Sequence, residues 1–157
     1  METLEIKKEA AIAAHENAKS SGKKLLEDLL GKKLFQKEVT DRIKTFDDVL
    51  DELEISKEEF TNAASVLESD EVAYRKVKLI AEALNEGWLP DWTDSNQYKY
   101  LPWFNMGGSS GSGFSFYGCG CWRTFSVCGS RLCFKSSELA SYAGKQFEKI
   151  YKEFLTL

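Results

Sequence analysis

Histidine and proline are scarce in this sequence of 157 residues, which has one histidine and two prolines. The histidine, His15, lies in a polar, alanine-rich stretch far along the chain from every cysteine. Catalysis by a Cys–His pair or a Ser–His–Asp triad needs a base within hydrogen-bond reach of the nucleophile. We therefore interpret His15 as a solvated surface residue and expect no such catalytic site.

Long hydrophobic runs are also missing, and none approaches the roughly 18 residues that span a membrane. The N-terminal stretch METLEIKKEAAIAAHENAK is charged throughout and lacks the apolar core of a secretory signal. We expect a cytoplasmic protein of the cell that makes it, with reduced cysteines and no membrane partner. Nothing in the sequence indicates a cofactor.

Charge and aromatic content divide the chain into two unlike parts. Residues 1–87 hold 20 acidic and 14 basic residues, a net charge of −6, whereas residues 88–157 hold 5 and 7, a net charge of +2. The first part has 4 aromatic residues and the second has 16. The acidic first part disfavours docking against DNA phosphates, because such binding depends on clustered Lys and Arg.

The first part of the chain has the apolar spacing of helices. A helical segment over residues 1–35 would contain helices at 3–19 and 23–30, separated by a break at Ser20-Ser21-Gly22. Its second helix would serve as a helical cap or as a homo-oligomerisation element through Leu25, Leu26, Leu29 and Leu30.

Short helices are also expected within residues 45–87 of an α+β domain spanning 36–157. A capping box at Thr45 and Asp48 begins the first of these helices, and Ser56 with Glu59 repeats the device. The longest helix is predicted over Asp70–Glu86, where Gly87 ends it.

The second part predicts a small antiparallel sheet within residues 97–135. Strands are indicated at 97–104, 114–117, 122–127 and 131–134, with Pro102 suggesting an edge strand. Gly118 and Gly120 suit a tight turn, and the Gly/Ser-rich residues 107–113 suit a flexible connection. One amphipathic helix over 137–155, capped by Ser136, should cover the sheet. The sequence therefore predicts an α+β fold, with a helical N-terminal half followed by this sheet and its covering helix.

Several word-like segments resemble a family of small uncharacterised proteins encoded by bacteriophages and mobile elements of gut bacteria. The segments, which lie within residues 18–155, are RIKTFD (42–47), ALNEGWLPDW (83–92), NQYKYLPWF (96–104), GSRLCFK (129–135) and ELASYAGKQF (138–147). The resemblance implies a phage-type cytoplasmic accessory protein or a virion component. It implies no reaction, cofactor or catalytic residue.

Four cysteines lie within fifteen residues, at Cys119, Cys121, Cys128 and Cys133. Structural zinc sites usually use a C-x2-C spacing, whereas this sequence has C-x-C and C-x4-C. We therefore expect no metal site and interpret these thiols as small buried hydrophobic side chains of the sheet. Zinc bound by all four is the alternative.

Aromatic and basic residues alternate through the second part in a manner typical of surfaces that stack bases and neutralise phosphates. The alternative is that most of these rings form the core, but the small sheet carries more rings than its interior can hide. The candidate ligand-binding residues, drawn from a cluster that also includes Trp88, are Trp92, Tyr98, Tyr100, Trp103, Trp122, Arg123, Arg131 and Lys135.

These patterns favour a non-catalytic protein that binds a nucleotide-like ligand, single-stranded nucleic acid or a host protein, including a component of a host defence system. A virion structural protein or packaged cargo is the second hypothesis. A small hydrolase using Asp91 and Asp94 is the third, although Asp in such a passage is ordinary turn chemistry.

Overall fold

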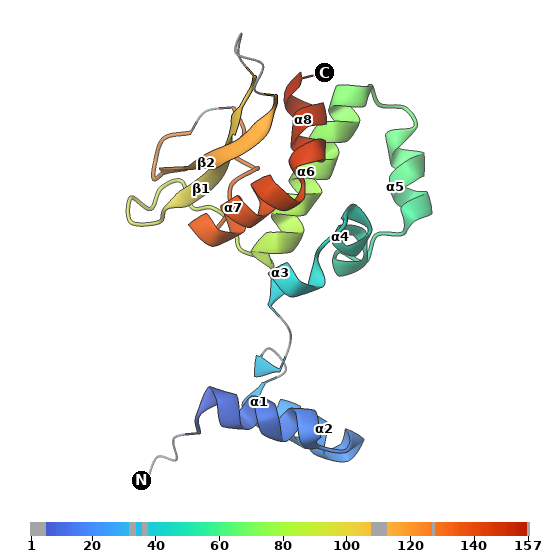
Figure 1. Cartoon of the computed structure of the whole chain (residues 1–157), viewed down its shortest axis with the longest axis vertical. Helices are drawn as coiled ribbons and strands as arrows, with labels where there is room; N and C mark the ends of the chain where they lie inside the picture. The colour runs from blue at the N-terminus through green and yellow to red at the C-terminus, as the bar shows by residue number, and fades with distance from the viewer. Residues whose placement is uncertain (1–5, 32–33, 36–37, 108–112, 127, 157) are drawn as a thin grey trace. The chain divides into compact units, whose positions relative to one another are not determined.

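The computed structural model describes residues 6–31, 34–35, 38–107, 113–126 and 128–156 (Figure 1). The chain divides into two compact units, Met1–Glu38 and Val39–Leu157. Within the described ranges, no helix is both long enough and apolar enough to cross a membrane. The α+β fold predicted from the sequence is confirmed.

The first unit is a pair of helices, α1 (Lys8–Asn17) and α2 (Ser20–Leu30). The predicted break at Ser20-Ser21-Gly22 is wrong, because these residues begin α2 and the extended backbone lies at Ala18 and Lys19. Gly22 lies close to Ala18, because a Cβ added to Gly22 would lie only 3.1 Å from the Cβ of Ala18. The small residues Ala18 and Gly22 allow only two residues to separate the end of α1 from the start of α2.

His15 is not the solvated residue predicted from the sequence. Its side chain is 16% exposed, and its Nε2 lies 2.9 Å from Glu27 Oε1. The imidazole also stacks on Phe35, with ring centroids 4.3 Å apart. His15 thus joins α1 to α2 and to the segment that follows them.

Four helices begin the second unit: α3 (Val39–Arg42), α4 (Phe46–Glu52), α5 (Lys57–Ala64) and α6 (Ser69–Asn85). The predicted capping box is confirmed at α4, where Thr45 Oγ1 accepts from the Asp48 N–H and Asp48 accepts from the Thr45 N–H. Hydrogen bonds from Lys44 and Thr45 lower the pKa of the Asp48 carboxyl group. At α5, Ser56 accepts from the Glu59 N–H, which is one half of the capping box predicted there.

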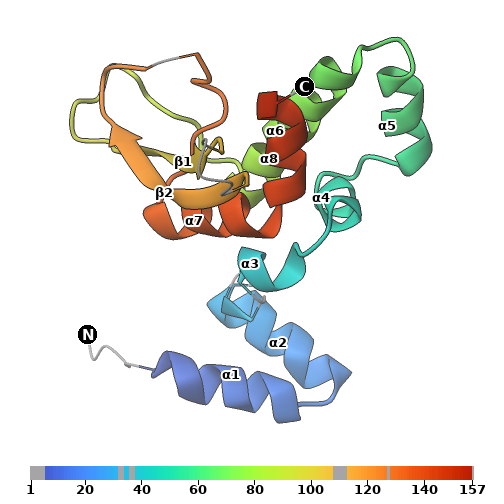
Figure 2. The same ribbon diagram turned by 45° about the horizontal axis from the view of Figure 1, so that its top comes forward.

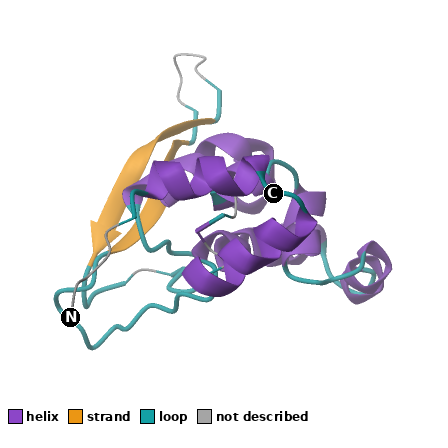
Figure 3. Ribbon diagram, turned by 90° about the horizontal axis from the view of Figure 1, so that it is seen from below, coloured by secondary structure: helices purple, strands orange, loops and turns teal. Residues whose placement is uncertain are grey.

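The sheet consists of two antiparallel strands in the described part of the chain, β1 (Lys99–Asn105) and β2 (Ser115–Trp122) (Figure 3). Lys99 pairs with Trp122, and Trp103 pairs with Gly118. On its other edge β1 makes one bridge, in which Tyr100 and Phe134 exchange backbone hydrogen bonds of 3.0 and 2.8 Å. The predicted strand at 131–134 is therefore reduced to a bridge at Phe134.

The predicted turn at Gly118 and Gly120 is wrong, because both residues lie inside β2. A Cβ on Gly120 would lie 2.5 Å from Trp103 Nε1 and 2.9 Å from the Trp122 ring. The absence of a side chain at Gly120 therefore makes room for the indoles of Trp103 and Trp122, and this explains the glycine without a turn. The predicted strand at 122–127 is also wrong, since residues 123–126 are exposed and do not continue β2, and Val127 lies outside the described residues. The chain after β2 crosses the side of the sheet opposite α7 (Figure 2).

The predicted C-terminal helix is two helices, α7 (Ser137–Gln146) and α8 (Glu148–Thr156). Ser136 caps α7 as predicted, by accepting from the Leu139 N–H at 3.3 Å. Helix α7 packs on both strands, whereas α8 packs on α6 (Figure 1). Helix α7 ends at Phe147 because the apolar residues of 137–155 pack on two different partners, the sheet on one side of Phe147 and α6 on the other. The buried core joins α6, α7, α8 and Phe134.

Gly144 sets how closely α7 approaches the sheet. A Cβ at this position would lie 2.4 Å from the Phe116 ring and 3.0 Å from Pro102 Cβ. We expect Gly144→Ala to lower the free energy of unfolding by about 1–3 kcal/mol through overpacking, even though Ala favours a helix.

Gly118→Ala is the matched control, because a Cβ there would meet nothing within 4 Å. We expect it to change stability by less than about 0.5 kcal/mol. Denaturant unfolding of both variants measures the difference, and equal midpoints would contradict the close approach of α7.

Candidate ligand-binding site

Lys99 begins β1 with a fully buried side chain. Its ammonium donates to three backbone carbonyls: Asp91 O, Gln97 O at 2.8 Å and Asp94 O at 3.3 Å. Three acceptors match the three donors of an ammonium group, so the site holds the charged form of the side chain. Removing such a charge from water is costly unless its donors are satisfied, and the carbonyl cage satisfies all three.

The carbonyl cage belongs to residues 91–97, which are folded by their own side chains. Asp91 Oδ1 accepts from the Thr93 N–H at 2.8 Å, and Asp94 Oδ1 accepts from the Asn96 N–H at 2.8 Å. The Asp91 N–H donates to Gln97 Oε1 at 2.7 Å. These local bonds turn the carbonyls inward, where Lys99 reaches them.

The carboxyl groups of this loop have a structural role. Hydrogen bonds from Thr93 are the main cause of the lowered pKa of Asp91, and the charge of Lys99 adds to them. The contribution of Asp91 to stability is therefore present above the ordinary pKa of 3.8 and is lost as the pH falls through its lower folded value. A general acid for hydrolysis needs a raised pKa, so the lowered pKa of Asp91 does not suit that one role.

A pocket of about 750 Å³ lies between α6, residues 87–92 and residues 130–133. We call it the tryptophan pocket, because Trp88 and Trp92 line it. Its charged lining residues are Lys78, Glu82 and Arg131, which leave a net positive charge. The volume lies within the range of about 300–1,000 Å³ that is usual for small-molecule sites.

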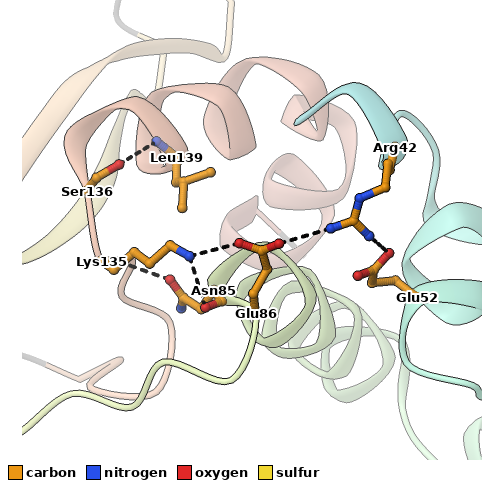
Figure 4. Close-up of polar contacts among 7 residues, drawn as sticks. All are labelled: Arg42, Glu52, Asn85, Glu86, Lys135, Ser136 and Leu139. Carbon is orange, nitrogen blue, oxygen red and sulfur yellow. Dashed lines mark hydrogen bonds and ion pairs between the residues drawn. The ribbon is translucent and has the colours of Figure 1, made fainter. Parts of the chain in front are cut away.

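Asn85 ties together the segments that form the pocket. Its Nδ2 donates to Cys133 O at 2.8 Å. Its Oδ1 accepts from the Lys135 N–H at 3.0 Å, a bond that is drawn in Figure 4. Asn85 is only 5% exposed, so these bonds fix residues 133–135 against the end of α6. The chain then leaves α6 through the left-handed residues Glu86 and Gly87, which direct it into the tryptophan segment.

Lys135 belongs to an ion network at the same end of α6. Its Nζ lies 3.0 Å from Glu86 Oε2, and Glu86 Oε1 lies 2.9 Å from Arg42 Nη2 (Figure 4). Arg42 also pairs with Glu52. Lys135 was predicted to bind ligand phosphates, but its charge is already engaged by Glu86.

The other predicted site residues fall into three places. Trp92 and Arg131 lie together in the tryptophan pocket. Arg123 lies over the Tyr98 ring, with its guanidinium carbon 4.5 Å from the centroid, and Tyr98 stacks on Tyr100.

Trp103 and Trp122 lie elsewhere, on the sheet face opposite α7, with ring centroids 6.3 Å apart. They line a smaller apolar pocket of about 180 Å³. The structure therefore separates the predicted single surface into distinct groups.

Two cations of the tryptophan pocket are not engaged by other side chains. In the described part of the chain, neither the Lys78 nor the Arg131 side chain has a hydrogen-bond or ion-pair partner. Arg131 is exposed and Lys78 is half-buried. Both are available to an anion, which distinguishes them from Lys135 and from Lys99.

A second hollow of about 640 Å³ lies along α6 and reaches Phe154. Its charged lining residues are two acids and two bases, Asp70, Glu71, Arg75 and Lys78, and it contains no tryptophan. Its rings are those of Tyr74 and Phe154, and its balanced charge leaves it with less to attract an anionic ligand than the tryptophan pocket has.

The sequence did not identify Lys78, Asn85 and Trp88 as residues of this region. It also did not identify Lys99 as the residue that holds the loop 91–97 in place. The burial of Lys99 could have been predicted, because in a strand its side chain lies on the same face as those of Leu101 and Trp103. A lysine at an apolar position indicates a buried amine with built-in acceptors. No local pattern marks Asn85, whose partners lie 48 and 50 residues away.

The cysteines are not the buried set predicted from the sequence, since only Cys133 is buried. Burial raises the pKa of its thiol, whose Sγ lies 3.3 Å from Ser130 O. Cys119 is exposed, with its Sγ 3.0 Å from Ser141 Oγ. The residues that the structure describes contain no group of three or more His, Cys, Asp or Glu placed to hold a metal ion.

Comparison with known proteins identifies no relative: no family model matches the chain, and neither a curated protein nor a solved structure is similar to it.

Replacing the buried ammonium should destabilise the protein strongly. We expect Lys99→Met to lower the free energy of unfolding by about 3 kcal/mol or more, because it leaves several buried carbonyls without a donor. Lys149→Met is the control, since Lys149 is an exposed lysine of α8. Both are measured by denaturant titration. A Lys99→Met protein as stable as the control would show that the cage contributes nothing.

Proposed function

We propose that this protein is a non-catalytic binding protein whose ligand is a nucleotide-like anion held in the tryptophan pocket. The observation that carries the proposal is the placement of Trp88 and Trp92 beside Lys78 and Arg131 in one pocket. Indole rings offer faces for a planar base, and the two cations offer partners for a phosphate. The proposal includes a phage-type accessory role, such as sequestering a nucleotide signal of a host defence system.

The groups best suited to acid–base chemistry are engaged elsewhere, which supports a binding role. His15 is the only histidine of the sequence, and it belongs to the first unit, where it contacts Glu27 and Phe35. Asp91 and Asp94 accept hydrogen bonds from N–H groups of their own loop.

Exposed aromatic side chains favour a second candidate function, which is binding to a protein. Trp103 is 52% exposed, and Tyr117 and Phe125 are 78% and 79% exposed. Large exposed rings of this kind are typical of protein contact surfaces. A host protein or a neighbouring subunit in a virion is the partner this candidate would bind.

Arg131→Ala tests the ligand-binding proposal. We expect it to weaken binding of nucleoside monophosphates by about tenfold, because a charge-assisted contact to phosphate is lost. Isothermal titration calorimetry over a panel of nucleotides and short oligonucleotides measures the change.

Arg123→Ala is the matched control, because Arg123 is exposed but contacts Tyr98 outside the pocket. We expect it to leave the affinity unchanged. No binding across the panel, together with recovery of the protein in purified phage particles, would contradict the ligand proposal and support the virion candidate.

A further inference from the structure

The Trp92 ring lines the tryptophan pocket and also contacts a buried positive charge. Lys99 Nζ lies 5.3 Å from the centroid of the ring. Trp92 lines the pocket, whereas Lys99 does not line it and is fully buried. A ligand in the pocket would therefore meet an indole that already has an ammonium over its ring.

This arrangement changes what the ring can bind. The face of an indole is electron-rich and attracts cations, which is why tryptophans recognise quaternary ammonium and methylated cationic groups. At Trp92 the electron-rich ring already attracts the ammonium of Lys99. A second cation stacked on the ring would also be repelled by the first across a short, partly dry distance.

The charge of Lys99 is incompletely neutralised by the groups around it. Its three hydrogen-bond partners are neutral carbonyl groups. The carboxylate that responds to its charge is Asp91, which is an exposed residue whose own hydrogen bonds come from Thr93. Solvent screens an exposed carboxylate more strongly than it screens the buried ammonium.

We propose that Lys99 is a specificity-determining residue that makes the tryptophan pocket select an uncharged purine ring over a cationic ring of the same shape. This inference rests on the proposed function, because it describes the base that the pocket receives. Arg131 and Lys78 would take the phosphate in either case, so the discrimination acts on the ring alone.

Guanosine 5′-monophosphate and 7-methylguanosine 5′-monophosphate provide a matched pair of probes. They carry the same phosphate and nearly the same ring, but methylation at N7 makes the ring cationic. We expect the methylated nucleotide to bind the full-length protein about 5- to 20-fold more weakly, from repulsion between its ring charge and the ammonium of Lys99. Isothermal titration calorimetry of both nucleotides measures the ratio. An equal or higher affinity for the methylated nucleotide would overturn the inference and leave the proposed function standing.

Trp92→Leu identifies the source of the discrimination. This variant removes the ring that Lys99 lies against, so we expect both nucleotides to bind more weakly and their affinity ratio to fall to within about twofold, as expected when no stacked cation remains. Because Lys99 remains in this variant, retention of the full ratio in a correctly folded Trp92→Leu protein would overturn the stacking of the ligand ring on Trp92. If neither nucleotide binds the unmodified protein, the proposed function fails, and the inference fails with it.

Discussion

A positive charge without solvent contact organises the most distinctive part of this molecule. The ammonium of Lys99 sits in a cage of backbone carbonyls from residues 91–97, and the Lys99 side chain is among the largest that are fully buried in the described structure. Three consequences follow from this cage. It fixes the start of β1, it closes the loop that precedes the strand, and it holds Trp92 at the edge of the pocket. A neutral apolar residue could fill the space but could not bind the carbonyls.

Local rules predicted much of the helical structure, because the relevant signals lie within a few residues of each other. The capping box of Thr45 and Asp48 and the cap at Ser136 depend on bonds between residues three apart, so the sequence alone reveals them. The α+β arrangement followed in the same way from apolar spacing. The break at Phe147 was missed because it arises from tertiary packing, in which one apolar stripe serves two partners.

The sheet and the candidate site were harder to predict for a related reason. Gly120 looked like a turn residue, whereas its small size serves the indoles of Trp103 and Trp122 packed above it. The pocket combines residues from α6 with two loop segments, and Asn85 joins them through bonds to Cys133 and Lys135. Composition indicated that some aromatic and basic residues would meet a ligand. It could not indicate that Trp92 and Arg131 would share a pocket while Lys135 would pair with Glu86.

The most direct test of this account is nitrogen-15 NMR spectroscopy of the lysine side chains. A caged ammonium exchanges its protons slowly, so Lys99 should give a resolved NH3+ signal with Overhauser contacts to the Trp92 indole. Exposed lysines should give none under the same conditions. If the Lys99 amine exchanges as fast as the exposed lysines and shows no contact with Trp92, then the carbonyl cage does not organise this region.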